Sequence, residues 1–527
     1  MNRQEQISKL QATKEFDICI IGAGATGAGI ALDATLRGLK VLLIDKSDFA
    51  GQTSSKSTKL IHGGVRYLEQ AVKKLDWEQY KMVRKSLRER ENLLKNAPHL
   101  SRPLALITPC FNLFEGIYYT IGMKLYEWIS GSQSIAKSEW LSKKGTLNLI
   151  PELKSKRLSS GVLYYDGQLD DARYCLAIVQ SAETFGAVVL NHTQALKFSK
   201  IEDNGRLKSL NIKDLIIGNE HTVNSKVFVN ATGPFADSIR QMASSKLKPR
   251  IKVSRGAHVV LPREVMKGDT AILVPKTDDG RVIFMIPWQD QVLVGTTDEA
   301  DELSENPKLE DYEKTYLLEY VNRYFEKTVT PDQIKSGFAG LRPLLQAQLQ
   351  SAMNSDTKSL VRDHEVEIDR RTKLVSIMGG KWTTYRLMAK DTLDEIYKEV
   401  FKKEIVKCTT ENQILHGGEN YRFEDWQNLV DKYGISKFTA EHLMKKYGIN
   451  AVKVMQLTDN QINLKELLAP NHPFIKAEVV YAIQEEMAQT VDDVLERRLG
   501  LKLRDEVASK AAKPYVEEIL LMNKIKY

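Results

Sequence analysis

The segment FDICIIGAGATGAGIALDATLRGLKVLLIDKSDF, residues 16–49, combines a strand pattern, a glycine-rich turn, a helix pattern and a second strand pattern. Residues 17–21 are apolar and rich in β-branched side chains, and the turn GAGATG follows at once. Residues 28–37 then have helical spacing, and residues 40–44 form the second apolar run. This register predicts a parallel βαβ unit that binds a dinucleotide, and it leaves open whether that is FAD or NAD.

Each glycine of this turn has a separate physical reason. Gly22 allows the tight turn, Gly24 lets the backbone approach a pyrophosphate, and Gly27 lets the helix pack closely on the strand. Asp45 ends the second strand, where a carboxylate can accept both hydroxyls of an adenosine ribose. A chance glycine-rich turn is the alternative interpretation, and the complete pattern disfavours it.

Length and composition limit the class of protein. A chain of 527 residues with 42% hydrophobic and 27% charged residues exceeds one ordinary core, so we expect two or three domains. The first residues contain no apolar core typical of a signal peptide, and the apolar stretch 104–129 is interrupted by Glu115 and Lys124. We therefore expect neither export nor a membrane-spanning helix.

The four cysteines are far apart and have no Cys-x-x-Cys spacing, which favours free thiols in a reducing compartment and indicates no zinc or other metal site. They are Cys19, Cys110, Cys175 and Cys408. The formal charge of +8 leaves nucleic acid, anionic lipid and anionic small molecules open as partners.

The segment GQTSSKSTKLIHGGVRYLE, residues 51–69, follows the second strand and favours FAD over NAD. Its hydroxyls and its glycine pair make a polar, sterically open stretch that can run along a second phosphate toward a flavin ring. The hydroxyls belong to Thr53, Ser54, Ser55, Ser57 and Thr58, and the glycines are Gly63 and Gly64.

This segment resembles the signature of the FAD-dependent glycerol-3-phosphate dehydrogenases, of the aerobic, quinone-linked type. Further motifs of that family follow in the same order along the chain. They are VNATGPFAD (229–237), SRGAHVVLP (254–262), VIFMIPWQDQVLVGTTD (282–298), GLRPLL (340–345) and MGGKWTTYRLMA (378–389). The resemblance implies FAD-dependent oxidation of sn-glycerol 3-phosphate to dihydroxyacetone phosphate, by hydride transfer to flavin N5, with electrons passed to membrane quinone.

The expected fold is α/β, with a Rossmann-like FAD-binding domain interleaved with an antiparallel-sheet substrate domain, followed by an all-helical C-terminal domain. Residues 1–405 form the FAD-dependent oxidoreductase domain and residues 406–527 the helical domain, where apolar residues recur at helical spacing. Within the first domain, we expect FAD-binding segments at about 16–96, 161–242 and 334–397 and substrate-binding segments at about 97–160 and 243–333.

Cofactor-binding residues are expected in the turn, in the hydroxyl segment and in two later glycine motifs. The set is Gly22, Gly24, Ala25, Thr26, Gly27, Asp45, Thr53, Ser54, Ser55, Ser57, Lys59, His62, Gly63, Gly64, Gly233, Gly380 and Thr383. Lys381 also begins an expected helix, whose N-terminus can stabilise an anionic reduced flavin.

The substrate phosphate needs cations, and three of them lie in glycine-flanked turns: Arg66, Arg342 and Lys381. The expected substrate-binding set is Arg66, Tyr67, Arg255, Arg342, Lys381 and Tyr385, and the expected catalytic set is His62, His258, Arg342 and Lys381. Either histidine can serve as general base, since imidazole titrates near neutrality, and the sequence does not separate them. The competing interpretations are solvated surface cations, structural histidines and packed aromatic rings.

A peripheral membrane contact is expected from a basic helical segment and from the aromatic tract 111–129. The basic residues are Lys73, Lys74, Lys81, Arg84, Lys85 and Arg88. We therefore expect a cytoplasmic protein, peripheral on the inner face of the cell membrane, and a homodimer is compatible with the pattern. Alternatives left open are an oxidase that uses O2, an amine or amino-acid oxidase, and a basic FAD-stabilised nucleic-acid-binding protein, although no nucleic-acid-binding motif is present.

Overall fold

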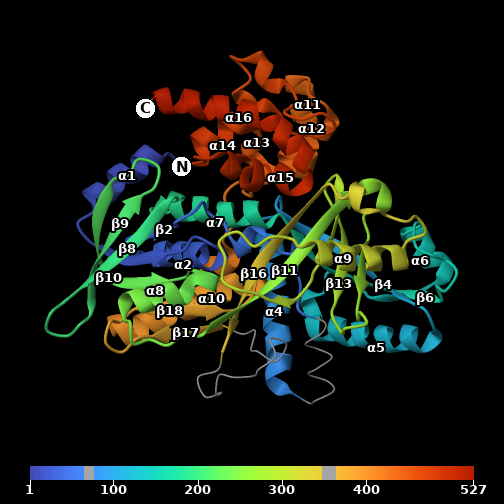
Figure 1. Ribbon diagram of the computed structural model, residues 1–527, viewed down its shortest axis with the longest axis horizontal. Coiled ribbons are helices and arrows are strands. Elements are labelled where there is room, and N and C mark those ends of the chain that lie inside the picture. The colour runs from blue at the N-terminus through green and yellow to red at the C-terminus, as the bar shows by residue number, and fades with distance from the viewer. Residues whose placement is uncertain (65–75, 347–363, 527) are drawn as a thin grey trace.

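The computed structural model describes residues 1–64, 76–346 and 364–526 (Figure 1). Its first sheet has the fingerprint strand β1 (Phe16–Ile21) near the middle, paired in parallel with β2 (Val41–Ile44) and β10 (Glu220–Asn230). The strand order is β17-β18-β10-β1-β2-β7, and β8 and β9 extend from β10 as an antiparallel meander. The other bounds are β7 (Val188–Leu190), β8 (Thr193–Lys200), β9 (Leu207–Asp214), β17 (His364–Ile368) and β18 (Val375–Gly379).

Helices cover both faces of this sheet, which explains why β2 is apolar at every position and β1 at all but Asp17. In β1, Ile18 and Ile20 point to one face and Cys19 and Ile21 to the other, as the strand period of two requires. The first face packs against α2 (Ala25–Leu36), α7 (Asp171–Thr184) and α10 (Tyr385–Glu395), and the second against α1 (Arg3–Ala12) and α8 (Ala236–Ala243).

The second sheet is largely antiparallel, with the order β15-β11-β14-β13-β12-β4-β6-β3; β16 pairs with β11 and β5 with β6. Its strands are β3 (Leu60–Ile61), β4 (Ser101–Cys110), β5 (Glu139–Ser142), β6 (Ser160–Leu169), β11 (Ile251–Pro262), β12 (Ala271–Val274), β13 (Ile283–Trp288), β14 (Gln291–Gly295), β15 (Glu299–Ala300) and β16 (Ser336–Leu345). Its accompanying helices are α4 (Trp77–Asn96), α5 (Leu113–Ser130), α6 (Lys143–Leu149) and α9 (Asp311–Tyr324).

The C-terminal part is helical and lies at the top of Figure 1, on the far side of the molecule from α5. Its helices are α11 (Trp426–Tyr433), α12 (Lys437–Tyr447), α13 (Ala451–Gln456), α14 (Lys476–Glu485), α15 (Leu501–Arg504) and α16 (Glu506–Lys526). They enclose two apolar clusters of their own. The expected fold class, a Rossmann-like domain interleaved with an antiparallel sheet and followed by helices, is confirmed.

Two strands of the expected FAD-binding segments belong to the second sheet. The segments 161–242 and 334–397 were expected to bind FAD, yet β6 and β16, with which they begin, pair with β4 and β11 in the second sheet. The local pattern of a buried strand is the same in either sheet, so only pairing partners distant in sequence reveal the assignment.

Two smaller expectations can be compared directly with the described residues. Among them, no helix combines the length and the apolarity that crossing a bilayer requires. The four cysteines are free; Cys19, Cys110 and Cys175 are buried and Cys408 is partly exposed.

Candidate active site

A cavity of about 2170 Å³ lies between the two sheets of the described chain. Its wall includes the glycine turn after β1, the hydroxyl segment 51–64, one face of β11 and β16, and the start of α10. An ordinary ligand pocket measures about 300–1,000 Å³, so this cavity has room for a dinucleotide together with a small substrate.

The turn forms a cradle from three glycines, Gly22, Gly24 and Gly27, and a side chain at any of them would collide with neighbouring atoms. Gly22 has a φ of +102°, and a Cβ there would lie 2.6 Å from the carbonyl oxygen of Ala231. A Cβ on Gly24 would lie 2.9 Å from Oγ of Ser54, and one on Gly27 would overlap the carbonyl oxygen of Gly22. The turn delivers the N-terminus of α2 to the cavity, with Gly24 as N-cap, and this end favours a phosphate group.

Asp45 ends β2 at the cavity wall, as its place in the sequence predicts. Its carboxylate accepts hydrogen bonds from the backbone N–H of Ala23 (2.6 Å) and of Ser47 (2.8 Å). Burial raises the pKa of Asp45, while these hydrogen bonds oppose the rise. The carboxylate therefore links the glycine turn to the end of β2 at the position where a ribose would be expected.

The hydroxyl segment has both lining and structural members. Thr53, Ser54 and Ser57 line the cavity. Oγ of Ser54 accepts from the N–H of Ala25 (3.0 Å), and Oγ1 of Thr53 donates to the carbonyl of Leu341 (2.6 Å) on β16. The segment is thereby tied to α2 on one side and to the second sheet on the other.

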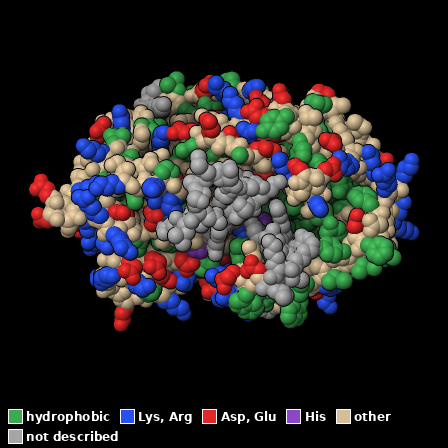
Figure 2. All heavy atoms as spheres, turned by 60° about the horizontal axis from the view of Figure 1, so that its bottom comes forward, with side chains coloured by type: hydrophobic (Ala, Val, Ile, Leu, Met, Phe, Trp, Pro, Cys, Tyr) green, Lys and Arg blue, Asp and Glu red, His purple; other side chains and the backbone are tan. Residues whose placement is uncertain are grey.

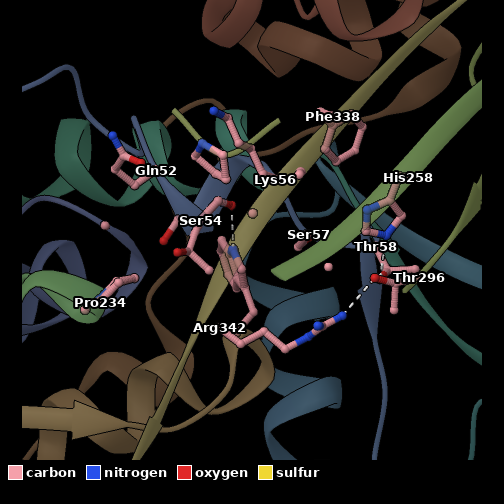
Figure 3. Close-up of a pocket in the computed structure, with 18 of the residues that line it drawn as sticks. Gln52, Ser54, Lys56, Ser57, Thr58, Pro234, His258, Thr296, Phe338 and Arg342 are labelled. Carbon is pink, nitrogen blue, oxygen red and sulfur yellow. Dashed lines mark hydrogen bonds between the residues drawn. The ribbon is translucent and has the colours of Figure 1, made fainter. Parts of the chain in front are cut away.

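Arg342 and His258 lie on the same face of the strand pair β11–β16. The antiparallel register places Ser254 opposite Arg342 and His258 opposite Phe338, so residues four apart on each strand share one sheet face. Figure 3 shows the guanidinium of Arg342 and the ring of His258 on the same side of the cavity, with Thr58 and Thr296 between them.

Hydrogen bonds hold the guanidinium of Arg342 in place. It donates to Oγ1 of Thr296 (2.8 Å) and to the carbonyl of Thr297 (3.0 Å), and it lies 3.2 Å from Oδ1 of Asp298. A Cβ on Gly256 of β11 would overlap this guanidinium, so that glycine makes room for the cation.

The ring of His258 is buried and stacks on Phe338 at 5.0 Å between centroids, while Nε2 lies 3.0 Å from Oγ1 of Thr58. Burial, and then the charges of Arg342 and Lys59, hold the pKa of His258 well below its usual value. The imidazole is therefore neutral near pH 7 and retains an acceptor nitrogen.

The family model for FAD dependent oxidoreductases matches residues 17–361, and that for the C-terminal domain of alpha-glycerophosphate oxidase matches residues 408–523. The mitochondrial glycerol-3-phosphate dehydrogenase of Mesocricetus auratus is 39% identical and that of Homo sapiens 38% identical; each alignment covers 98% of this chain and 72% of the relative. The chain belongs to the glycerol-3-phosphate dehydrogenase family of FAD-dependent oxidoreductases.

Solved structures agree with this assignment. The glycerol-3-phosphate dehydrogenase from Bacillus halodurans, complexed with FAD, superposes with a TM-score of 0.78 at 28% identity, over 99% of this chain and 93% of that one. The L-alpha-glycerophosphate oxidase from Mycoplasma pneumoniae shares the fold, with a TM-score of 0.55 at 16% identity, over 76% of this chain and 98% of that one. The cofactor of this family member is FAD, and the glycine cradle fits it.

Most of the residues expected to bind FAD line the cavity. They are Gly22, Gly24, Ala25, Thr26, Asp45, Thr53, Ser54, Ser57, His62, Gly64, Gly233, Gly380 and Thr383. Gly27, Ser55, Lys59 and Gly63 are not part of the lining. Lys59 lies behind the wall, where its Nζ is buried 2.5 Å from Oδ1 of Asp171 and donates to the carbonyl of Ser55 (2.6 Å). The ammonium group of Lys59 therefore stabilises the segment 51–64 and does not contact the cavity.

The expected substrate residues separate into three groups. Arg342, Lys381 and Tyr385 line the cavity, although the ring of Tyr385 is buried and packs edge-on against neighbouring aromatic rings. Arg255 lies outside the lining and instead pairs with Asp301 (3.0 Å) and Glu313 (3.3 Å). Arg66 and Tyr67 lie outside the described residues. Adjacent positions of a strand point to opposite faces, which is why β11 directs Arg255 away from the side of Ser254 and His258.

The two remaining catalytic candidates lie at the cavity near α10. The backbone N–H of His62 donates to Oγ1 of Thr383 (3.4 Å), and Nζ of Lys381 contacts Sδ of Met82 (3.4 Å). Both His62 and Lys381 line the cavity, as does His258 on β11.

Three cavity residues have no role in the sequence interpretation. Two of them left a signal: Gly256 interrupts a strand pattern, which marks a close approach, and Thr296 stands in the matched motif 282–298. The third, Trp382, donates from Nε1 to the carbonyl of Ser54 (2.9 Å), a contact between segments 328 residues apart that no local pattern signals.

Proposed function

We propose that this protein oxidises sn-glycerol 3-phosphate to dihydroxyacetone phosphate and passes the electrons to membrane quinone. The observation that supports it most directly is that Arg342 and His258 lie on one face of the β11–β16 pair, in the cavity that contains the FAD cradle. An amino-acid oxidase needs a cation for the substrate carboxylate, whereas two cations that line one cavity, Arg342 and Lys381, suit the greater negative charge of a phosphate. A phosphorylated alcohol also requires a proton acceptor for its hydroxyl.

Arg342 binds the substrate phosphate when N–H groups of its guanidinium turn from Thr296 and Thr297 to the phosphate oxygens, and Lys381 adds a second positive charge to the same cavity. When bound, FAD accepts the hydride from C2 of the substrate. The accompanying proton leaves the C2 hydroxyl for a neutral imidazole, and His258 is the base that we favour over His62. A phosphate on Arg342 offsets the positive charge that lowers the pKa of His258, so substrate binding makes this imidazole a stronger base.

The experiment is an anaerobic titration of the purified holoprotein with sn-glycerol 3-phosphate, followed by flavin absorbance. Bleaching that a ubiquinone or menaquinone analogue reverses is the expected result. Absence of bleaching with FAD bound refutes the substrate, and reoxidation by O2 as fast as by quinone supports the oxidase alternative.

The membrane part of the proposal is supported by α5, whose outer face is apolar. Phe114 (84% exposed), Ile117, Tyr118, Ile121 (64%) and Trp128 (73%) recur at helical spacing. Figure 2 turns the bottom of Figure 1 toward the viewer. Hydrophobic side chains gather toward the right of that view, the side on which α5 lies in Figure 1. Tyr118 and Ile121 also line the cavity, so an apolar acceptor held at this face is close to the cavity entrance.

Helix α4 packs against α5 and presents exposed cations beside the apolar face, which suits an anionic lipid surface. They are Lys81, Arg84, Lys85 and Arg88; Lys81 and Arg88 also form surface pairs with Glu78 and Glu411. Lys73 and Lys74 lie outside the described residues.

Co-sedimentation with vesicles that contain anionic phospholipid tests this contact. The double variant Phe114→Ser/Trp128→Ser is expected to lose most of the binding. The matched control is Val507→Ser/Leu521→Ser, which removes two exposed apolar side chains from α16 on the far side of the molecule. Equal binding by both double variants refutes the assignment of the surface.

A further inference from the structure

A buried chain of polar groups lies directly beneath the segment that contains His62. The backbone N–H of Gly63 donates to Oη of Tyr126 on α5 (2.7 Å), and Tyr126 donates to Oδ1 of Asp166 on β6 (2.9 Å). Asp166 in turn pairs with Arg90 on α4 (2.6 Å). All four groups are shielded from solvent, and Tyr126 is 3% exposed.

The direction of each hydrogen bond in this chain follows from the chemistry of the groups. Burial raises the pKa of Asp166, and the charge of Arg90 opposes that rise. The carboxylate accepts from both Arg90 and Tyr126, so the single hydroxyl proton of Tyr126 points to Asp166. A lone pair of Oη then remains for the N–H of Gly63. Burial, and then the charge of Asp166, raise the pKa of Tyr126 well above its usual value, so the phenol keeps this proton.

The backbone at Gly63 packs closely against side chains of α4 and α5. A Cβ on Gly63 would lie 2.7 Å from both Cδ2 of Leu87 and Oη of Tyr126. On its other side, the N–H of His62 donates to Thr383. Two consecutive backbone N–H groups are therefore held by hydroxyls from α5 and from the turn before α10.

We propose that Tyr126 is a positioning residue, whose hydroxyl holds the amide of Gly63 and so sets where His62 lies in the cavity. Tyr126 itself is outside the cavity lining, whereas His62, Gly64 and Asp166 belong to it. The inference rests on the proposed function where it concerns substrate oxidation, and on hydrogen bonding alone where it concerns the amide of Gly63.

The test compares Tyr126→Phe with Tyr447→Phe in the FAD-loaded protein. Tyr447 is a matched control because it is equally buried and its hydroxyl also donates to a carboxylate at 2.9 Å, that of Glu478 in the helical domain. In Tyr126→Phe the aromatic ring keeps its packing against Val83, Leu87 and Ile129, so only the hydroxyl is lost.

The first readout is hydrogen–deuterium exchange of the Gly63 amide, followed by mass spectrometry with residue-level fragmentation. Exchange is expected to speed up about tenfold or more in Tyr126→Phe and to be unchanged in Tyr447→Phe. The second is rapid-mixing measurement with sn-glycerol 3-phosphate. The limiting rate of flavin bleaching is expected to fall about tenfold in Tyr126→Phe, with the substrate Kd changed by less than about threefold.

Unchanged exchange at Gly63 overturns the proposal, and so does an equal loss of rate in both variants, which indicates a general structural effect. If Tyr126→Phe does not fold, the wild-type protein still decides the matter, because a Gly63 amide that exchanges as fast as exposed amides excludes the buried bond. If sn-glycerol 3-phosphate fails to bleach the wild-type protein, the proposed function is wrong, while the exchange comparison still reports on Tyr126.

Discussion

Replacing Arg342 by Gln tests the cation on which the proposed substrate site depends. The substitution removes the charge and the planar fork, and it leaves a shorter, neutral side chain that still hydrogen-bonds. Two charge-assisted hydrogen bonds to phosphate contribute about 1.5–3 kcal/mol each. Part of this loss is recovered by water in a cavity open to solvent. We expect a net loss of about 3–4 kcal/mol, which corresponds to a decrease in kcat/KM of about 10²- to 10³-fold.

The assay is steady-state turnover of sn-glycerol 3-phosphate with a quinone analogue, together with the ratio of flavin to protein absorbance. FAD content should stay at the wild-type level, since Arg342 is on the second sheet, away from the glycine turn. The matched control is Arg255→Gln, on the strand that pairs with β16, where Asp301 and Glu313 are the partners of the cation.

We expect Arg255→Gln to retain kcat/KM within about threefold, because its side chain lies outside the cavity lining. If Arg342→Gln retains kcat/KM within the same range, or if Arg255→Gln loses as much as Arg342→Gln, the reasoning from cavity position to phosphate binding is refuted.

Three further predictions concern Thr58, Gly27 and His99. Thr58→Val removes the hydroxyl beside His258, so kcat should fall about tenfold with FAD retained, and a wild-type kcat in steady-state assays would contradict this role. Gly27→Ala places a methyl group against the carbonyl of Gly22, so the purified variant should contain less than about one tenth of the wild-type FAD by absorbance; full FAD content would refute the close packing. His99 is buried, and its pKa is lowered to about 3, first by burial and then by nearby charges. Below about pH 6.5 the unfolded chain therefore binds a proton that the folded chain does not, and stability falls as the pH drops. Between about pH 7 and pH 5 this cost is about 2 kcal/mol in denaturant unfolding, and His99→Gln should be correspondingly less sensitive to pH; equal sensitivity would show that His99 is not responsible.

The family and the cofactor could be predicted from local chemistry. A turn with φ of +102° at Gly22 and a helix that approaches its carbonyl at Gly27 tolerate almost nothing but glycine. Such constraints leave a pattern within a few residues, and the pattern is readable without the rest of the fold.

Other roles depended on contacts between distant segments. Lys59 and Arg255 stand in family motifs, as Arg342 does. In the structure, however, Lys59 pairs with Asp171, and Arg255 pairs with Asp301 and Glu313. Arg342 also has a carboxylate neighbour, Asp298, but it lines the cavity, whereas Lys59 and Arg255 do not. Which cations line the cavity depends on the segments that become neighbours, and those segments are far apart in the chain.

By itself, therefore, the sequence determined the dinucleotide turn, the family and the set of chemically competent side chains, because steric and covalent demands act over a few residues. Only the tertiary structure decided which of those side chains share the cavity. The register of β11 against β16 brings His258 and Arg342 to the same sheet face, and the packing of α5 against α4 places Tyr126 beneath Gly63. Sheet pairing and helix packing are long-range, and a period-two strand pattern is the same whichever partner it meets.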